Sequence, residues 1–293
     1  MTEMKGAVSA LLESLANRPS MKRTGDFEKD GILHCGQCGE PRQAWVDWIP
    51  DKDGNVEKRL VYVQCQCDAL REAEEKERRK QENFDASMRI MGEVLQTERG
   101  SVQWDFSHDD SPTSPASRTC RRYIEDWEDM KRQNLGILIY GSKGNGKSFY
   151  ASCVYNELVK KRVLCGFTST ANLMNILSKW DKTEIIEAIK RAQLLVLDDL
   201  GAERETSYSA ELMYYVIDER YKTGLPTIVT TNYALSNMEQ EEDLTRARIY
   251  DRIIEMCPIT LKMEGPSRRS GIADERKRLA REIMFGVKNG GNP

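Results

Sequence analysis

The chain has 293 residues and a formal net charge of -3; 31% of its residues are charged and 39% are hydrophobic. This length allows a full-sized core and a smaller module, so we expect two domains. Its longest apolar runs are far too short to cross a bilayer and its N-terminus lacks a signal sequence, so we expect a cytoplasmic protein and exclude a membrane protein. The net charge gives no global basic signature, so any nucleic-acid contact has to come from local patches or from a ring of subunits.

The first segment, residues 1–20, carries apolar side chains at helical spacing. Starting from Val8, leucines recur at i+3, i+4 and i+7, and Pro19 ends the pattern. We expect a helix whose apolar face packs on its own domain or on a partner.

Residues 31–67 form a short, turn-rich segment with two cysteine pairs. The run Pro50–Asn55 is typical of a hairpin turn between two strands, which predicts a small β module. The pairs have the spacings C-x-x-C and C-x-C, and a glycine after the first pair suits a knuckle that directs backbone N–H groups at sulfur. The four cysteines are Cys35, Cys38, Cys65 and Cys67. Four thiolates satisfy tetrahedral Zn²⁺, so we predict a closed, structural zinc site.

Two alternatives to this zinc site are open. His34 stands next to the first cysteine and is a substitute ligand for one thiolate. A redox dithiol would account for the first pair but not for the second. The remaining cysteines are scattered, and in a reducing compartment we expect them to be small buried apolar residues. They are Cys120, Cys153, Cys165 and Cys257.

Composition also suggests where the domains divide. In residues 68–83 acidic and basic residues alternate with almost no apolar stripe, which predicts a solvated helix that acts as a spacer or as a contact surface. Residues 107–118 are rich in Ser, Pro and Asp and are the best linker candidate. We therefore expect an N-terminal module over 1–90, a linker over 91–118 and a second domain over 119–293.

In the second domain, apolar strands alternate with helices. Strands are expected at 135–141, 163–169, 194–199, 226–232 and 258–263. Helices are expected at 146–161, 171–180, 182–192, 209–224 and about 239–255. Such an alternation, with near-continuous apolar strands, indicates a parallel sheet covered by helices on both faces, the α/β nucleotide-binding architecture.

The strongest motif is GSKGNGKS, which matches the P-loop pattern G-x-x-x-x-G-K-[ST] between a predicted strand and a predicted helix. Its glycines let backbone N–H groups wrap phosphates, and the helix N-terminus adds a favourable field. We expect Lys147 to bridge the β- and γ-phosphates of ATP and the Ser148 hydroxyl to ligate Mg²⁺. The expected nucleotide-binding residues are Gly141, Ser142, Lys143, Gly144, Asn145, Gly146, Lys147 and Ser148. A chance glycine-rich turn does not explain Lys and Ser at the last two places.

Two polar strand ends complete the predicted site. The strand LLVLDD ends in two carboxylates, of which Asp198 is expected to hold Mg²⁺ and Asp199 to polarise the attacking water. An acidic pair at a strand end is otherwise an ordinary cap or turn, but its combination with a P-loop favours ATP hydrolysis. Asn232 ends IVTTN and is expected to orient the water, although asparagine also commonly begins a turn.

Two arginine-containing segments are candidates for contact with a neighbouring subunit. Arg248 and Arg252 are four residues apart and share a helical face, from which they can point at a neighbour's γ-phosphate. The alternative is that they are solvated helix charges. Arg268 and Arg269 follow in GPSRRSG.

From about Trp104 to Arg269 the chain resembles the AAA+ ATPases of the DnaC/DnaI helicase-loader group, which includes the IstB-like ATP-binding proteins. The similar stretches, in order, are GILIYGSKGNGKS, LLVLDDLGAE, PTIVTTN, RIYDRI and GPSRR. The resemblance implies that Asn232 is sensor 1 and that Arg269 is the sensor 2 residue. It also implies that Arg252 is the arginine finger acting in trans, with Arg248 near it.

The chain departs from the group's pattern in two places. Its second acid is Asp199 where the group has Glu, which implies slow hydrolysis. Too few residues follow Arg269 for a full helical lid, so we expect an ATPase domain without one.

The resemblance further implies a helicase loader that uses ATP, Mg²⁺ and Zn²⁺. Such a protein binds a DnaB-type replicative helicase through its N-terminal module and places it on single-stranded DNA, in an oligomer assembled through its ATP sites. It works in the cytoplasm of a bacterial or phage-infected bacterial cell, and the cysteine spacing resembles phage and Gram-positive-type loaders. The alternatives are an IstB-like transposition helper on duplex DNA and a non-catalytic scaffold that binds nucleotide only structurally. The cysteine module and the charged helix favour the loader.

Overall fold

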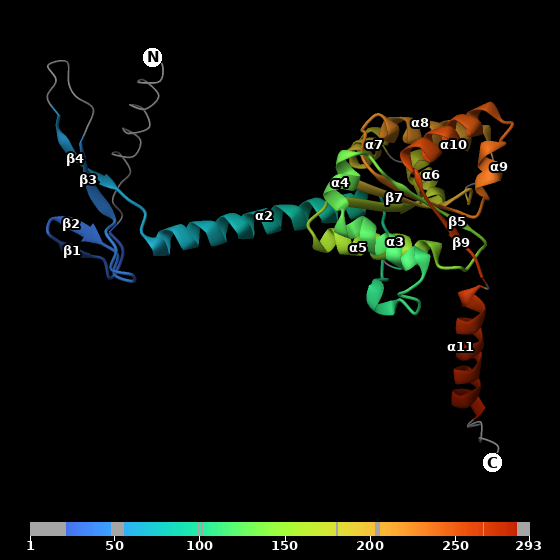
Figure 1. Cartoon of the computed structure of the whole chain (residues 1–293), viewed down its shortest axis with the longest axis horizontal. Helices are drawn as coiled ribbons and strands as arrows, with labels where there is room; N and C mark the ends of the chain where they lie inside the picture. The colour runs from blue at the N-terminus through green and yellow to red at the C-terminus, as the bar shows by residue number, and fades with distance from the viewer. Residues whose placement is uncertain are drawn as a thin grey trace. The chain divides into compact units, whose positions relative to one another are not determined.

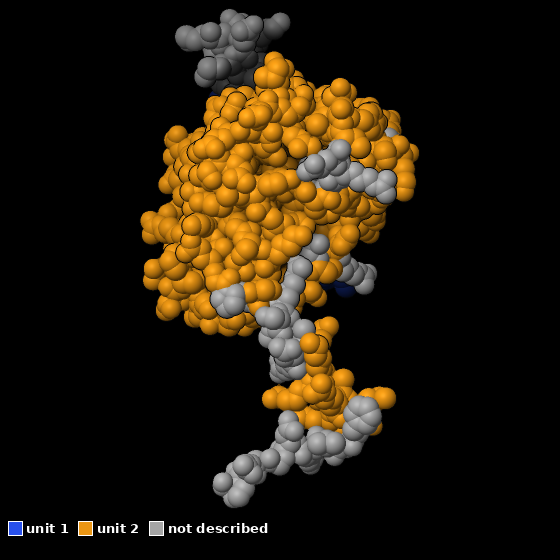
Figure 2. All heavy atoms as spheres, turned by 90° about the vertical axis from the view of Figure 1, so that its right-hand side faces the viewer, with its two compact units in different colours: residues 1–83 blue, residues 84–293 orange. Residues whose placement is uncertain are grey.

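The structure is a computed structural model of the chain, and it divides into two compact units. It describes residues 22–47, 56–98, 100, 102–179, 181–202, 206–265 and 267–285, the last range with side chains only at 267 and 276–284. The units are Met1–Asn83 and Phe84–Pro293, which are blue and orange in Figure 2.

Unit 1 contains two small antiparallel sheets among its described residues (Figure 1). Their strands are β1 (Phe27–Lys29), β2 (Ile32–His34), β3 (Gln43–Asp47) and β4 (Lys58–Tyr62). β1 pairs with β2, and β3 pairs with β4 in a register that places Trp45 opposite Leu60. The β module expected over 31–67 is therefore present. The hairpin turn expected at Pro50–Asn55 and the helix expected over 1–20 lie outside the described residues.

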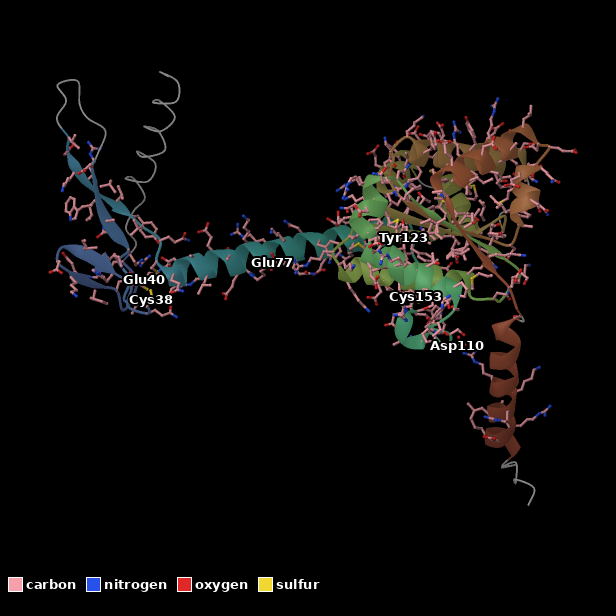
Figure 3. All side chains as sticks on the ribbon, in the orientation of Figure 1. Cys38, Glu40, Glu77, Asp110, Tyr123 and Cys153 are labelled. Atoms are coloured by element: carbon pink, nitrogen blue, oxygen red, sulfur yellow. The ribbon has the colours of Figure 1, made fainter. Side chains whose placement is uncertain are left out.

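One long helix, α2 (Gln66–Val94), begins in unit 1 and ends in unit 2. Its first part is the charged segment, and side chains such as Glu77 are exposed on it (Figure 3). Toward its end it becomes apolar: Met91, and Leu95 just after the helix, are buried in the core of unit 2. This burial explains why the helix continues past the predicted range 68–83. Neither α2 nor any other described helix is long and apolar enough to cross a membrane.

Unit 2 is built on a parallel sheet, which has five strands within the described residues. They are β5 (Ile137–Gly141), β6 (Cys165–Ser169), β7 (Leu194–Leu200), β8 (Thr227–Thr231) and β9 (Ile259–Met263). Their order in the sheet is β6-β7-β8-β5-β9, and every neighbouring pair is parallel. Because parallel strands end at the same edge, the carboxyl ends of β5, β7 and β8 meet there.

Helices cover both faces of this sheet (Figure 1). They are α3 (Pro115–Glu125), α4 (Trp127–Arg132), α5 (Lys147–Lys160), α6 (Thr170–Lys179), α7 (Lys182–Arg191), α8 (Ser207–Tyr221), α9 (Leu235–Glu239) and α10 (Leu244–Met256). Side chains alternate between two cores along each strand. Ile137 and Ile139 pack with α3, α4 and α5, whereas Leu138 packs with α6, α7, α8 and α10. The predicted α/β sheet covered on both faces is confirmed.

The helix predicted over about 239–255 corresponds to α10, which begins later than predicted, at Leu244, and is separated from the preceding α9. The break lies at Asp243, whose side chain accepts a hydrogen bond from the backbone N–H of Arg246 at 2.9 Å. This contact satisfies a helix N-terminus that would otherwise be unpaired, so a new helix begins at Leu244. A further helix, α11 (Arg268–Phe285), follows β9.

Residues 91–118, where we expected a linker, belong to unit 2. The Ser152 hydroxyl on α5 donates a hydrogen bond to the backbone carbonyl of Trp104 at 3.1 Å. The Asp109 side chain is fully buried and accepts a hydrogen bond from the Tyr150 hydroxyl at 3.3 Å. The Ser, Pro and Asp residues here form turns and caps that attach the segment to α5, and the division between the units falls before it.

Candidate nucleotide-binding site

The P-loop, residues 141–148, connects β5 to α5 and has a course that favours glycine at three positions. Gly141, Gly144 and Gly146 have φ angles of 137°, 84° and 94°. A Cβ atom on Gly141 would lie 2.2 Å from the carbonyl oxygen of Met263, and one on Gly144 would lie 2.0 Å from the Ser267 hydroxyl oxygen. Glycine is therefore required at both positions by close packing against the chain's own Met263 and Ser267, which holds the loop in its course. The loop leads directly into the N-terminus of α5, whose free N–H groups fit the phosphates of ATP.

Asn145 attaches this loop to the end of β9. Its side chain is buried, and Nδ2 donates to Ser142 Oγ at 2.8 Å and to the carbonyl oxygen of Met263 at 3.2 Å. Lys143, in contrast, is exposed. Because the next helix begins directly at Lys147, the positive end of its dipole lies at the loop.

The Lys147 ammonium group links the P-loop to two other predicted site residues. Its Nζ donates to the carbonyl oxygens of Gly141 at 3.0 Å and Ser142 at 2.9 Å, and to Oδ1 of Asn232 at 2.7 Å. Asn232 donates in turn from Nδ2 to Oδ1 of Asp199 at 3.0 Å. The structure thus joins residues from α5, β7 and the end of β8 in one chain of hydrogen bonds.

The other carboxylate, Asp198, is buried on β7. Its Oδ1 accepts a hydrogen bond from the Thr230 hydroxyl at 2.6 Å, and the Ser148 side chain also hydrogen-bonds to it. Burial raises the pKa of Asp198 and the neighbouring Asp199 charge adds to this, while the two hydroxyls and the charge of Lys147 lower it. A carboxylate beside a serine hydroxyl supplies the hard oxygen ligands that Mg²⁺ prefers, so this donor set fits the ion.

Thr230 is a site residue that the sequence analysis missed. It is completely buried, and its hydroxyl accepts the backbone N–H of Asp199 at 2.8 Å besides donating to Asp198. A signal for it exists in the sequence, because the adjacent threonines Thr230 and Thr231 follow two apolar residues at the end of the predicted strand, next to Asn232.

The predicted arginines lie on α10 and α11. Arg252 forms an ion pair with Asp218 of α8, with 2.6 Å between Nη2 and Oδ1, and is only 24% exposed. Arg248, one turn earlier on α10, is exposed. Arg268 and Arg269 begin α11, and their side chains lie outside the described residues. Arg252 is thus held against its own chain, although we expected it to point toward a neighbour.

Residues 57–274, which include the P-loop and the whole parallel sheet, match the family described as IstB-like ATP binding protein. The chain belongs to the IstB-like ATP-binding protein family. The five parallel strands, the covering helices and the P-loop form the AAA+ fold.

Several curated relatives of this IstB-like protein are helicase loaders. The replicative helicase loader DnaC of Escherichia coli is 26% identical over 140 residues, which are 45% of this chain and 54% of that protein. The replicative helicase loader DnaI of Bacillus subtilis is 27% identical over 148 residues, 46% of this chain and 47% of that protein. The chain therefore spans about half the length of these relatives.

A solved structure of DnaI has the same fold as this IstB-like protein. It superimposes with a TM-score of 0.50 at 24% identity and covers 59% of this chain and 94% of that one. A putative ATP-binding protein in an insertion sequence of Mycobacterium tuberculosis is also related, with 24% identity over 173 residues, 56% of this chain and 66% of that protein.

A second candidate site of this IstB-like protein is the cysteine cluster of unit 1. The sulfur atoms of Cys35, Cys38 and Cys65 lie within 4.8 Å of one another. Backbone N–H groups of Cys38 and Gln37 lower the pKa of Cys35 to about 7, as the predicted knuckle requires. Cys67, the fourth predicted ligand, is not one of these three, and its hydrogen bond with Cys38 raises the pKa of Cys67 to about 11. Crowded thiols, one of them stabilised as a thiolate, fit Zn²⁺.

Two polar residues, His34 and Glu40, lie near the cysteine cluster, and His34 is the alternative ligand considered above. Nδ1 of His34 lies 3.0 Å from the carbonyl oxygen of Ile32, and the ring stacks on Phe27, so His34 is engaged within its own hairpin. Glu40 lies beside the cluster, with Oε2 4.0 Å from the sulfur of Cys38 (Figure 3). The same oxygen accepts the backbone N–H of Gln66 at 2.6 Å, which holds the start of α2 next to the cysteines.

Proposed function

We propose that this chain is an ATP-hydrolysing protein that loads a DnaB-type replicative helicase onto single-stranded DNA. The observation that carries the ATPase part is the hydrogen-bonded chain from Lys147 through Asn232 to Asp199. It connects the P-loop lysine to an amide and a carboxylate of the kind that a hydrolysing site needs, whereas a scaffold that binds nucleotide only structurally has no use for it. The relatives named as replicative helicase loaders support the loading part.

Each site residue has a role in the proposed reaction. The P-loop N–H groups bind the phosphates of ATP, and Lys147 leaves Asn232 to bridge the β- and γ-phosphates. Asp199 accepts a proton from the attacking water, and Asn232 orients that water. Ser148 and Asp198 would hold Mg²⁺, which supplies positive charge to the phosphates when bound. We expect slow hydrolysis, because aspartate has a shorter reach than the glutamate of the similar family.

The proposed helicase-binding part is unit 1. It is a compact unit of its own with a cysteine cluster, so a partner can bind it without disturbing the parallel sheet. The chain carries a net charge of -3, so contact with single-stranded DNA would come from local patches combined in an oligomer. The oligomer would form through the ATP sites. For the arginine finger we now favour Arg248, since Arg252 is paired with Asp218.

A second candidate function is that of an ATP-dependent transposition helper on duplex DNA. The insertion-sequence relative in Mycobacterium tuberculosis favours it. Single-stranded and duplex oligonucleotides of equal length, offered with ATP, separate the two functions by which one the protein binds.

The test uses the full chain and the variant Lys147→Ala. The wild type is expected to bind ATP, to hydrolyse it and to co-elute with the DnaB-type helicase of a bacterial host in size-exclusion chromatography. Lys147→Ala is expected to bind ATP roughly a hundredfold more weakly, because charged hydrogen bonds to the phosphates are lost. Lys160→Ala, at the exposed far end of the same helix, is the control. If Lys147→Ala binds ATP as tightly as the wild type, the P-loop is not the ATP site. If the wild type hydrolyses ATP but forms no complex with the helicase, the proposed loading function is refuted.

A further inference from the structure

The strand β7 is irregular at its two carboxylate residues. Its pairing with β8 shifts register between Leu197 and Leu200. Within this bulge Asp199 has a φ of 59°, which lies in the left-handed region. That conformation is unfavourable for a residue with a Cβ atom, so neighbouring groups have to hold it. Bulges of this kind change the direction of side chains beside functional sites.

Thr230, on β8, bonds to both residues of the bulge. Its hydroxyl donates to Oδ1 of Asp198 at 2.6 Å and accepts the backbone N–H of Asp199 at 2.8 Å. A hydroxyl has one hydrogen to donate, so donation to Asp198 fixes its direction and leaves its lone pairs for the N–H of Asp199. Because the threonine side chain is completely buried, water does not compete for either bond.

Two other completely buried threonines on β8 provide a comparison. The hydroxyl of Thr231 donates to the carbonyl oxygen of Leu200 at 2.9 Å. The hydroxyl of Thr227, at the amino end of the strand, accepts from Nε of Arg220 at 3.1 Å. These bonds join the strand to its surroundings, whereas those of Thr230 go to the two acids of the site.

We propose that Thr230 is a positioning residue of the ATPase site, which holds the Asp198 carboxylate for Mg²⁺ and holds the backbone of Asp199 so that its carboxylate meets Asn232. This proposal deepens the proposed function and rests on it. The bond to Oδ1 prevents free rotation of the Asp198 carboxylate. The bond to the Asp199 N–H holds the left-handed turn from which Asp199 reaches Nδ2 of Asn232 at 3.0 Å.

The experiment measures the binding of a fluorescent ATP analogue to the full chain in EDTA and across a Mg²⁺ titration. Thr230→Val removes the hydroxyl at nearly constant volume, and Thr230→Ser keeps it. In EDTA, Thr230→Val is expected to bind the analogue within about twofold of the wild type, because the P-loop contacts are intact. It is expected to need roughly tenfold more Mg²⁺ for half-saturation, the effect of losing a hydrogen bond to a charged group. Thr230→Ser is expected to match the wild type within about twofold.

Thr227→Val is the matched control, because it removes an equally buried hydroxyl from the other end of the same strand. It is expected to lower the Tm while leaving the Mg²⁺ dependence unchanged. An identical Mg²⁺ dependence in Thr230→Val and the wild type would overturn the proposal. So would an equal rise in the Mg²⁺ needed for half-saturation in Thr227→Val. If Thr230→Val does not fold, Thr230→Ala gives the same comparison. If the wild type itself shows no Mg²⁺-dependent binding, the proposed ATPase function fails instead.

Discussion

Asn232 contacts the P-loop lysine with one end of its amide and a carboxylate with the other. Its Oδ1 lies 2.7 Å from Nζ of Lys147, and its Nδ2 lies 3.0 Å from Oδ1 of Asp199. Under the proposed function, the phosphates of ATP would compete with Asn232 for the lysine and release the amide on one side only. Asn232 would then signal an occupied P-loop to Asp199.

We predict that Asn232→Ala separates hydrolysis from binding. Single-turnover ATP hydrolysis should fall about a hundredfold, because the water and Asp199 lose their orienting group. The Kd for ATP should stay the same or become tighter, because Lys147 no longer has a competing partner. The matched control is Asn237→Ala on α9, where the asparagine is exposed and both quantities should be unchanged. A loss of ATP affinity in Asn232→Ala would mean that this residue supports the P-loop itself.

On α10, two arginines one turn apart have different environments. The guanidinium of Arg252 is paired with Asp218 and lies 4.5 Å from the ring centroid of Tyr214, whereas Arg248 is exposed. Arg252 therefore holds α10 against α8, and Arg248 is the exposed arginine of the two.

We predict opposite effects for the two alanine variants. Arg252→Ala should lower the Tm by several degrees, since a half-buried ion pair and a cation–π contact together contribute about 1–2 kcal/mol. Arg248→Ala should leave the Tm unchanged and lower ATP hydrolysis roughly a thousandfold, as loss of an arginine finger does. Mixing Arg248→Ala with Lys147→Ala should restore part of the activity, because each variant supplies what the other lacks. If only Arg252→Ala abolishes hydrolysis at an unchanged Tm, the assignment is reversed.

The elements that follow from local pattern could be predicted from the sequence, and those that depend on pairing could not. Glycine spacing located the P-loop, and apolar runs located the strands of the sheet. The hydrogen bond between Thr230 and Asp198 depends on which strands are neighbours in the sheet and on the bulge in β7. Local sequence determines neither of these. The ion pair of Arg252 depends likewise on the packing of α10 against α8. The attachment of residues 102–118 depends on partners on α5.

Within the whole molecule, the two units differ in what supports their cores. Among the described residues, the buried apolar side chains of unit 1 are Leu33, Val61 and two of the clustered cysteines. Beside them Arg42, itself buried, forms ion pairs with Asp26 and Asp68. So small an apolar core is typical of modules that a metal holds together. Unit 2 has two extensive apolar cores, one on each face of its sheet, and does not need a metal to hold it together.

We therefore predict that removal of zinc unfolds unit 1 and leaves unit 2 intact. The purified chain should contain one zinc ion, measured by elemental analysis, and a chelator should abolish the thermal transition of unit 1. With a zinc-selective chelator and Mg²⁺ kept in excess, the Kd for the fluorescent ATP analogue should stay within about twofold of its value before zinc is removed, because the P-loop belongs to the other unit. Zinc should also bind more weakly as the pH falls, because protons compete with the metal for the cysteine thiolates.

Cys65→Ser tests the same prediction without a chelator. It should lose zinc and the unit 1 transition together, because Cys65 is one of the three sulfurs within 4.8 Å of one another. Cys153→Ser is the matched control: this cysteine is buried on α5 in unit 2, so its loss should lower the stability of unit 2 while the zinc content stays at one per chain. A metal-free chain in which unit 1 keeps its transition would show that the ion pairs of Arg42 suffice to hold the module. In that case the cysteine cluster would have a role other than zinc binding, and a redox dithiol would be the alternative to test.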